Sequence, residues 1–93
     1  MPHFVYMIGS YKDLKLTTYV GYTNNLKNRL KKHNTSKGAK FTKGRFWKII
    51  YYEKHTTKNS ALSREYAFKK DRKLRNFIKN KFKNNENINT ITL

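Results

Sequence analysis

The 93-residue chain contains no cysteine, one proline and only five acidic residues. The absence of cysteine excludes disulfides, cysteine nucleophiles and thiolate metal sites. Five acids and three histidines leave little material for a closed zinc site. The apolar run from Phe4 to Ile8 is too short for a signal-peptide core, and no run approaches the roughly 20 apolar residues of a membrane-spanning helix. We therefore expect a cytoplasmic protein.

Positive charge dominates the residues that are present. The 22 Lys and Arg side chains outnumber the acids by 17, which favours a polyanionic partner: nucleic acid first and an anionic membrane surface second. The chain is still 37% apolar and 15% aromatic, so it can fold, and its length leaves room for one core. We predict one domain over residues 1–83 and an Asn-rich, flexible tail over residues 84–93.

The local pattern predicts a small α+β domain. Runs of apolar and β-branched residues predict strands over residues 4–8, 17–23 and 46–52, and the third, apolar on both faces, is predicted to be the buried centre of the sheet. Cap residues followed by helical spacing predict helices that begin near residues 25, 59 and 71. The expected fold is a three-stranded antiparallel sheet flanked by helices, in the order β-β-α-β-α-α.

Two tyrosines are predicted to share one face of the sheet. A hairpin that is symmetric about the bond between Lys12 and Asp13 places Tyr6 opposite Tyr19, and any even slip of register keeps both on one face. Such a pair is usually packing. Gly21, inside the second strand, indicates either a bulge or tight packing.

Three polar residues lie at helical spacings that suggest chemistry. Glu65, four residues after Ala61, lies on the apolar side of its helix, where a carboxylate needs a partner: a cation in a salt bridge or a bound metal. Glu53, at the end of the third strand, is expected to be exposed.

Arg29 and His33, four residues apart, point to the same side of their helix. Arg offers a fork for phosphate and His carries a proton near neutral pH. From the residues alone, the composition favours a solvated basic face for Arg29, and His33 fits an ordinary histidine at the edge of the core equally well.

A basic loop separates the first helix from the third strand. Its cations are predicted to contact backbone phosphates or to be merely solvated, and they are Lys37, Lys40, Lys43 and Arg45. Phe41, which lies between them, is a candidate to stack on a base, the alternative again being a merely solvated side chain.

Together these motifs resemble the GIY-YIG nuclease superfamily. Val5-Tyr6 followed by Tyr19-Val20-Gly21-Tyr22-Thr23 resembles the paired motif that names it. The segments that resemble its small stand-alone, UvrC-like endonuclease branch are Asn24-Asn25-Leu26 with Arg29 and His33, Gly38-Ala39-Lys40-Phe41-Thr42, Tyr51-Tyr52-Glu53, Ala61, Glu65 and Lys69-Lys70. The resemblance runs from about Phe4 to Lys70. One departure is that Phe4-Val5-Tyr6 replaces Gly-Ile-Tyr, which alters the packing of that strand.

The resemblance implies that Tyr6, Tyr19, Arg29, His33 and Glu65 converge on one site that cleaves a phosphodiester. Glu65 would hold one divalent cation, Mg²⁺ in preference to Mn²⁺, and Arg29 would stabilise charge on the phosphoryl oxygens. Tyr6 would take a proton from the attacking water, either with a pKa lowered by nearby cations or with His33 as a relay. Tyr19 would position the water or bind phosphate, and Gly21 would permit close approach near the site.

We therefore predict a metal-dependent endonuclease with little sequence specificity, acting on DNA in preference to RNA. Single-stranded, duplex, nicked and branched substrates all remain open. The alternative is a non-catalytic nucleic-acid-binding module that keeps the nuclease fold. A membrane-surface binder is a third, weaker interpretation, since the helices lack a broad apolar face with Trp anchors. No small-molecule cofactor is expected, and a monomer is the default.

Overall fold

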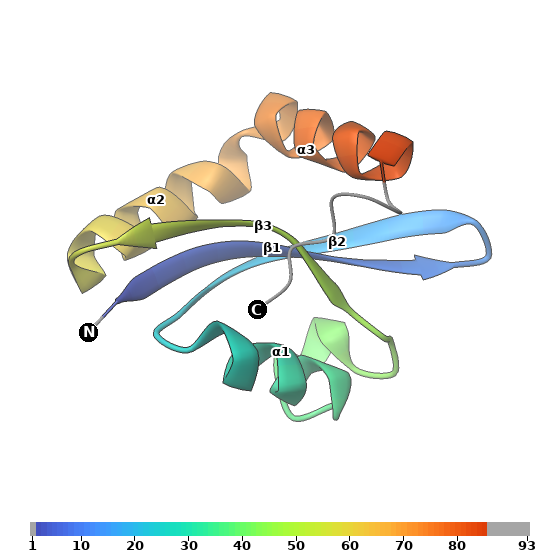
Figure 1. Cartoon of the computed structure of the whole chain (residues 1–93), viewed down its shortest axis with the longest axis horizontal. Coiled ribbons are helices and arrows are strands. Elements are labelled where there is room, and N and C mark those ends of the chain that lie inside the picture. Colours follow the sequence, from blue (N-terminus) through green and yellow to red (C-terminus); the bar gives the residue numbers. More distant parts are fainter. Residues whose placement is uncertain (1, 86–93) are drawn as a thin grey trace.

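The computed structural model describes residues 2–85 and confirms the α+β class (Figure 1). Its elements are β1 (His3–Lys12), β2 (Lys15–Thr23), α1 (Leu26–Asn34), the 3₁₀ helix η1 (Lys40–Thr42), β3 (Lys48–His55), α2 (Lys58–Lys70) and α3 (Arg72–Asn85). The three strands form one antiparallel sheet in the order β2-β1-β3. Helix α3 extends through Asn85, and the remainder of the predicted tail, residues 86–93, lies outside the described residues.

The centre of the sheet is β1, so the prediction that the third strand is central is wrong. Strand β1 pairs with both neighbours, and its residues from Val5 to Ser10 are all buried. Strand β3 is an edge strand. It is nevertheless apolar on both faces because helices cover both sides of the sheet: Ile49 and Ile50 enter different cores. A doubly covered edge strand therefore resembles a central one in sequence.

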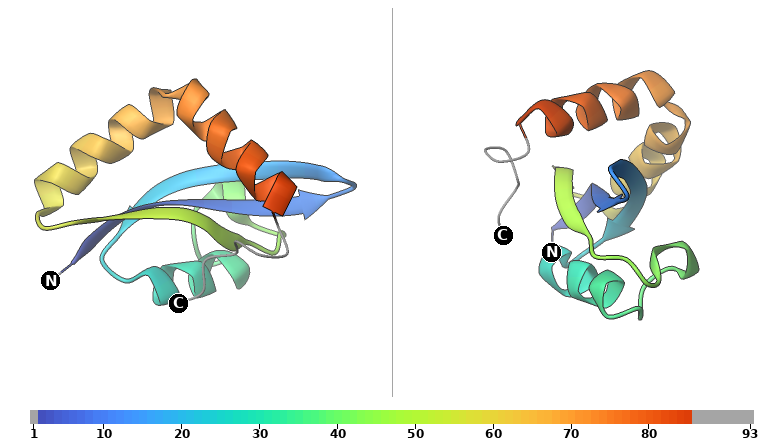
Figure 2. Two further views of the ribbon diagram at one scale, coloured as in Figure 1. Left: turned by 45° about the horizontal axis from the view of Figure 1, so that its top comes forward. Right: turned by 90° about the vertical axis from the view of Figure 1, so that its right-hand side faces the viewer.

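Two cores lie on opposite faces of the sheet. Helices α2 and α3 cover one face and meet at an angle above it, while α1 and η1 cover the other (Figures 1 and 2). The first core contains Val5, Met7, Val20, Phe68 and Phe82, among others. The second contains Tyr6, Ile8, Leu26, Trp47 and Ile49, with Tyr19 packed against it. The α1 face is thus the one that holds the two tyrosines.

The hairpin register confirms that the tyrosines share a face. Tyr6 pairs with Gly21 and Tyr19 pairs with Ile8, which is a slip of two residues from the symmetric alignment. An even slip preserves the face. The slip follows from a two-residue turn at Asp13 and Leu14, whose φ angles of 53° and 66° match the positive values that tight hairpin turns require.

Glu53 is half-buried, which corrects the expectation that it is exposed. Arg64 of α2 donates to its carboxylate from Nε at 2.9 Å and from Nη2 at 2.8 Å, and the Tyr51 hydroxyl donates at 2.6 Å. These bonds, above all those from Arg64, lower the pKa of Glu53 to about 2. Glu53 therefore joins α2 to the edge strand β3 as a structural group.

Candidate active site

Tyr6 stands at the centre of the polar residues that the sequence singled out. It occupies the middle of β1, only 1% exposed, and its hydroxyl lies 2.7 Å from His33 Nε2. Arg29 Nε donates to the same oxygen at 3.4 Å. One helical turn separates Arg29 from His33, so α1 directs both side chains to a single phenol, as their spacing predicts.

Glycine makes room for this phenol. Gly21 faces Tyr6 across the β1–β2 pair, and a Cβ atom built on Gly21 would lie 2.6 Å from Tyr6 Cζ. Any larger residue would therefore displace the ring. Of the two interpretations of Gly21, the structure supports tight packing, and the group that packs there is the side chain of Tyr6.

His33 is fully buried and bonded on both ring nitrogens. Its Nδ1 lies 2.8 Å from the Thr42 hydroxyl, while Nε2 faces Tyr6. A Cβ atom on Gly38 would lie 2.5 Å from Nδ1, so this glycine is also needed for space. Sequence reasoning identified Gly38 and Thr42 only as parts of a motif and missed their contact with the histidine. The signal available to find them was their place in that motif, 5 and 9 residues after His33.

Burial sets the resting protonation of Tyr6 and His33. Burial raises the pKa of Tyr6 to about 12, against the opposing effect of Arg29. Burial, assisted by the charge of Arg29, lowers the pKa of His33 to about 4. At pH 7 the phenol is therefore protonated and the imidazole is neutral. Forming the tyrosinate at that pH costs about 7 kcal/mol, compared with about 4 kcal/mol for an ordinary phenol.

Tyr19 lies beside His33 and forms an aromatic stack with Phe41. The Tyr19 and His33 rings meet edge to face at 5.5 Å, and the Tyr19 and Phe41 rings stack at 6.0 Å with 21° between their planes. Phe41, in η1, is 59% exposed. This pair therefore extends the site from the buried histidine to an aromatic surface open to solvent.

Glu65 lies on α2, the helix on the opposite face of the sheet from α1. Its carboxylate pairs with Lys69 Nζ at 3.2 Å, and its negative charge contributes to the raised pKa of Tyr6. Lys58, Glu65 and Lys69 are spaced by seven and four residues, so they share one side of α2. The salt bridge that the sequence allowed is thus present, and Glu65 still acts electrostatically on the tyrosine.

Two open clefts border β2, the edge strand on the opposite side of the sheet from β3. The Arg29 cleft has a volume of about 310 Å³, and its walls include Tyr22, Asn28, Arg29, Lys32 and Lys58. The Phe41 cleft has a volume of about 480 Å³ and is formed by Thr18, Tyr19, Val20, Phe41, Lys69 and Arg75. From Thr18 to Tyr22 the strand advances about 14 Å. Each cleft combines side chains from both faces of the sheet: the Arg29 cleft joins α1 to α2, and the Phe41 cleft joins η1 to α2 and α3.

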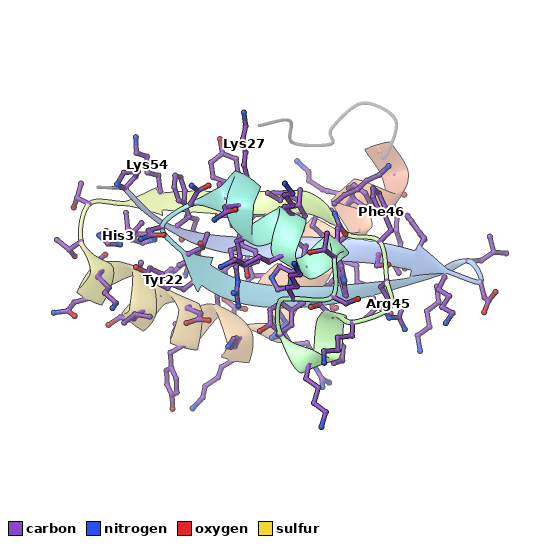
Figure 3. The ribbon with its side chains drawn as sticks, turned by 90° about the horizontal axis from the view of Figure 1, so that it is seen from below. His3, Tyr22, Lys27, Arg45, Phe46 and Lys54 are labelled. Carbon is purple, nitrogen blue, oxygen red and sulfur yellow. The ribbon has the colours of Figure 1, made fainter. Side chains whose placement is uncertain are left out.

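The basic loop lies on the α1 face (Figure 3). Lys37, Lys40 and Lys43 are exposed and Arg45 is half-buried. Within residues 2–85, Nη1 of Arg45 is buried without a hydrogen-bond partner, so the pairing of this donor is incomplete. Figure 3 shows Lys27 and Lys54 toward one end of this face and Arg45 toward the other, so positive charge extends along its length.

The donor atoms of the site suit one kind of metal. No group of three or more His, Cys, Asp and Glu side chains able to hold an ion together occurs among the described residues. Glu65 is a single carboxylate that pairs with Lys69, a residue of the Phe41 cleft. Mg²⁺ is commonly bound by one or two carboxylates together with water and substrate phosphate, whereas zinc requires three or four protein ligands. The residues present therefore fit magnesium held jointly with substrate.

In the described part of the chain no helix has the length and apolar character required to cross a bilayer.

Comparison with known proteins identifies relatives across most of the chain. The profile of the GIY-YIG catalytic domain matches residues 2–83. A UPF0213 protein of Oceanobacillus iheyensis is 44% identical over 68 residues, covering 72% of this chain and 76% of the relative. One of Bacillus licheniformis is 48% identical over 69 residues, covering 73% and 68%. The solution NMR structure of a UPF0213 protein from Bacillus halodurans is 35% identical, with a TM-score of 0.47, and the match covers 85% of this chain and 84% of that one.

Proposed function

The chain belongs to the GIY-YIG family, a family of nucleases, and we propose that it is an endonuclease that hydrolyses phosphodiester bonds in DNA with little sequence specificity. GIY-YIG nucleases generally use divalent metals, and we propose Mg²⁺ in preference to Mn²⁺ here. The observation that carries the proposal is the Tyr6 hydroxyl, which Arg29 and His33 both contact beside the Arg29 cleft. A phosphate in that cleft would meet the Arg29 guanidinium, which itself donates to the Tyr6 hydroxyl.

The pKa values favour a relay over a free tyrosinate. With the pKa of Tyr6 at about 12, a preformed tyrosinate is rare at pH 7. In a relay, the attacking water gives its proton to Tyr6 Oη while the phenolic proton passes to His33 Nε2. The water oxygen then forms the new bond to phosphorus and the bond to the leaving oxygen breaks. No charge accumulates on Tyr6, because it accepts and gives one proton in the same step.

Arg29 and the substrate both assist this transfer. The guanidinium, always charged, stabilises negative charge on the phosphoryl oxygens. Phosphate bound next to Arg29 offsets the positive charge that lowers the pKa of His33, so the imidazole becomes a better acceptor when substrate is present. Glu65 would hold the metal, which when bound supplies positive charge to neutralise the phosphate and the leaving oxygen.

The alternative is a module that binds nucleic acid without cleaving it. The positive charge of the chain suits such a module as well as it suits a nuclease, because binding needs only exposed cations. The buried Tyr6–His33 bond favours the enzyme, since a neutral imidazole hidden beneath the sheet adds nothing to phosphate binding. Glu65 favours it too, because a carboxylate among cations weakens attraction for a polyanion.

The direct test is a cleavage assay. The protein is incubated with end-labelled single-stranded, duplex, nicked and branched DNA, and with RNA of matched sequence, in Mg²⁺ or in EDTA. We expect internal cleavage of DNA that EDTA abolishes and Arg29→Ala lowers by about 10²-fold or more. Tight binding without cleavage of any substrate in Mg²⁺ or Mn²⁺ would refute the nuclease and support the binding module.

Binding should depend steeply on salt, with part of that dependence residing in the basic loop. Replacing Lys37, Lys40, Lys43 and Arg45 together by alanine should flatten the plot of log K against log salt by about 0.7–0.9 for each phosphate that the variant no longer neutralises. The matched control removes four exposed cations that lie outside the loop, Lys12, Lys15, Lys73 and Lys83. Filter binding at several salt concentrations measures both slopes. A slope that the substitution of the four loop residues leaves unchanged would place the binding surface away from the loop.

A further inference from the structure

The hydrogen atoms around His33 can be assigned from their partners. The Thr42 hydroxyl lies 2.7 Å from the Ala39 carbonyl and 2.8 Å from His33 Nδ1. A carbonyl only accepts, so the single hydroxyl hydrogen of Thr42 must lie on the line to Ala39, since two acceptors at that distance repel. The Thr42 oxygen is then an acceptor toward the ring, and His33 Nδ1 must carry a hydrogen.

The other end of the ring follows from this assignment. With its hydrogen on Nδ1, the neutral imidazole has only a lone pair at Nε2. The contact of 2.7 Å with Tyr6 then requires the phenol to donate. Arg29 Nε donates to the same phenolic oxygen, which fits an oxygen whose own hydrogen points at His33. The hydrogen bonds therefore form one chain in which each group donates to the next, from Tyr6 to His33, from His33 to Thr42 and from Thr42 to the Ala39 carbonyl.

We propose that Thr42 is a positioning residue of this site, whose hydroxyl, oriented by the Ala39 carbonyl, holds His33 in the Nδ1–H tautomer so that Nε2 can take the Tyr6 proton. This inference rests on the proposed nuclease function for its catalytic consequence. In the other tautomer, Nε2 carries a hydrogen and the relay has no acceptor. When His33 takes the proton it becomes a positively charged imidazolium. Thr42 also stabilises this charge, because its hydroxyl oxygen accepts a hydrogen bond from Nδ1–H.

The surroundings of Thr42 are built to hold it in place. Its side chain is fully buried, and its carbonyl accepts a bond of 2.9 Å from the Trp47 indole. Asn34, the last residue of α1, holds the Trp47 backbone by accepting from its N–H and donating to its carbonyl. Gly38 leaves the space in which Nδ1 approaches the hydroxyl. The position of η1 relative to α1 is therefore fixed at the point where Thr42 meets His33.

Imidazole ¹⁵N NMR tests the tautomer without reference to activity. In the wild-type protein, long-range spectra should show His33 as neutral with hydrogen on Nδ1. Thr42→Val, nearly isosteric but without an acceptor, should shift the population toward Nε2–H, and Thr42→Ser should restore Nδ1–H. Thr35→Val is the matched control, because the Thr35 hydroxyl, directly after α1, donates to the Lys31 and Lys32 carbonyls of that helix. A wild-type His33 with hydrogen on Nε2 overturns the proposal even if no Thr42 variant folds.

Cleavage kinetics then test the consequence. We expect Thr42→Val to lower kcat by about 10²-fold or more with unchanged DNA affinity, and Thr42→Ser to recover most of it. Full activity in a folded Thr42→Val protein would overturn the positioning role. If the wild-type protein cleaves nothing, the proposed function fails, whereas the NMR result still decides whether Thr42 sets the tautomer.

Discussion

We expect Glu65→Gln to abolish cleavage, while the affinity for DNA stays equal or becomes tighter. The amide is nearly isosteric but a poor ligand for Mg²⁺, so the anchor for the metal is removed. The same change removes one negative charge between the two clefts, which strengthens attraction for phosphate, most visibly at low salt. Glu65→Ala should behave alike. Nuclease assays beside filter binding at two salt concentrations measure both effects.

Glu53→Gln is the matched control, because Glu53 is a structural carboxylate. Its loss weakens the bonds from Arg64, and we expect the free energy of unfolding to fall by about 2 kcal/mol at pH 7 with cleavage retained. The pKa of Glu53 is lowered to about 2 from 4.5, so its contribution is present above pH 4.5 and is lost as the pH falls toward 2. The variant should lack this part of the acid destabilisation.

A purely structural Glu65 would give another result. Its partner Lys69 is half exposed and four residues away, and such pairs contribute only about 0.3–0.5 kcal/mol. Glu65→Gln would then leave both the melting temperature and cleavage almost unchanged. Cleavage retained in a folded Glu65→Gln protein would therefore show that the carboxylate belongs to a surface salt bridge and not to the catalytic site.

Tyr6→Phe should lower kcat by about 10²–10⁴-fold, because it removes the hydroxyl through which the proton passes and keeps the ring. The buried Nε2 of His33 loses its donor, so we expect the free energy of unfolding to fall by about 1–3 kcal/mol. Circular dichroism should still report a folded protein. Single-turnover kinetics and thermal melts separate the loss of rate from the loss of stability.

Tyr19→Phe is the companion variant. Tyr19 contacts His33 through its ring, which phenylalanine preserves, so the rate should fall less than for Tyr6→Phe. Wild-type rates in both variants would contradict the tyrosine relay and leave His33 or a metal-bound hydroxide as the base. A larger loss for Tyr19→Phe than for Tyr6→Phe would exchange the roles that we assign to the two phenols.

The sequence alone determined the class of fold, because hydrophobic patterns and helix-capping residues are local properties of the chain. Runs of apolar and β-branched residues predict the strands. Asn25 and Asp71 indicate helix starts, where their side chains indeed accept from the backbone N–H groups of Asn28 and Leu74. The face shared by Tyr6 and Tyr19 was also predictable, since it depends only on whether a register slip is even. The four-residue spacing of Arg29 and His33 placed both on one side of α1.

Only the tertiary structure decided which strand is central, which groups are buried and which bonds His33 makes. Strand order depends on contacts between distant segments, so the apolar residues of β3 could not distinguish an edge covered on both faces from a centre. Glu53 and Glu65 are both carboxylates in the same half of the chain, yet only the position of Arg64 makes the first a structural group. Thr42 reaches His33 because η1 folds back over α1, and burial, which sets the pKa values of both relay groups, exists only once the layers have closed over them.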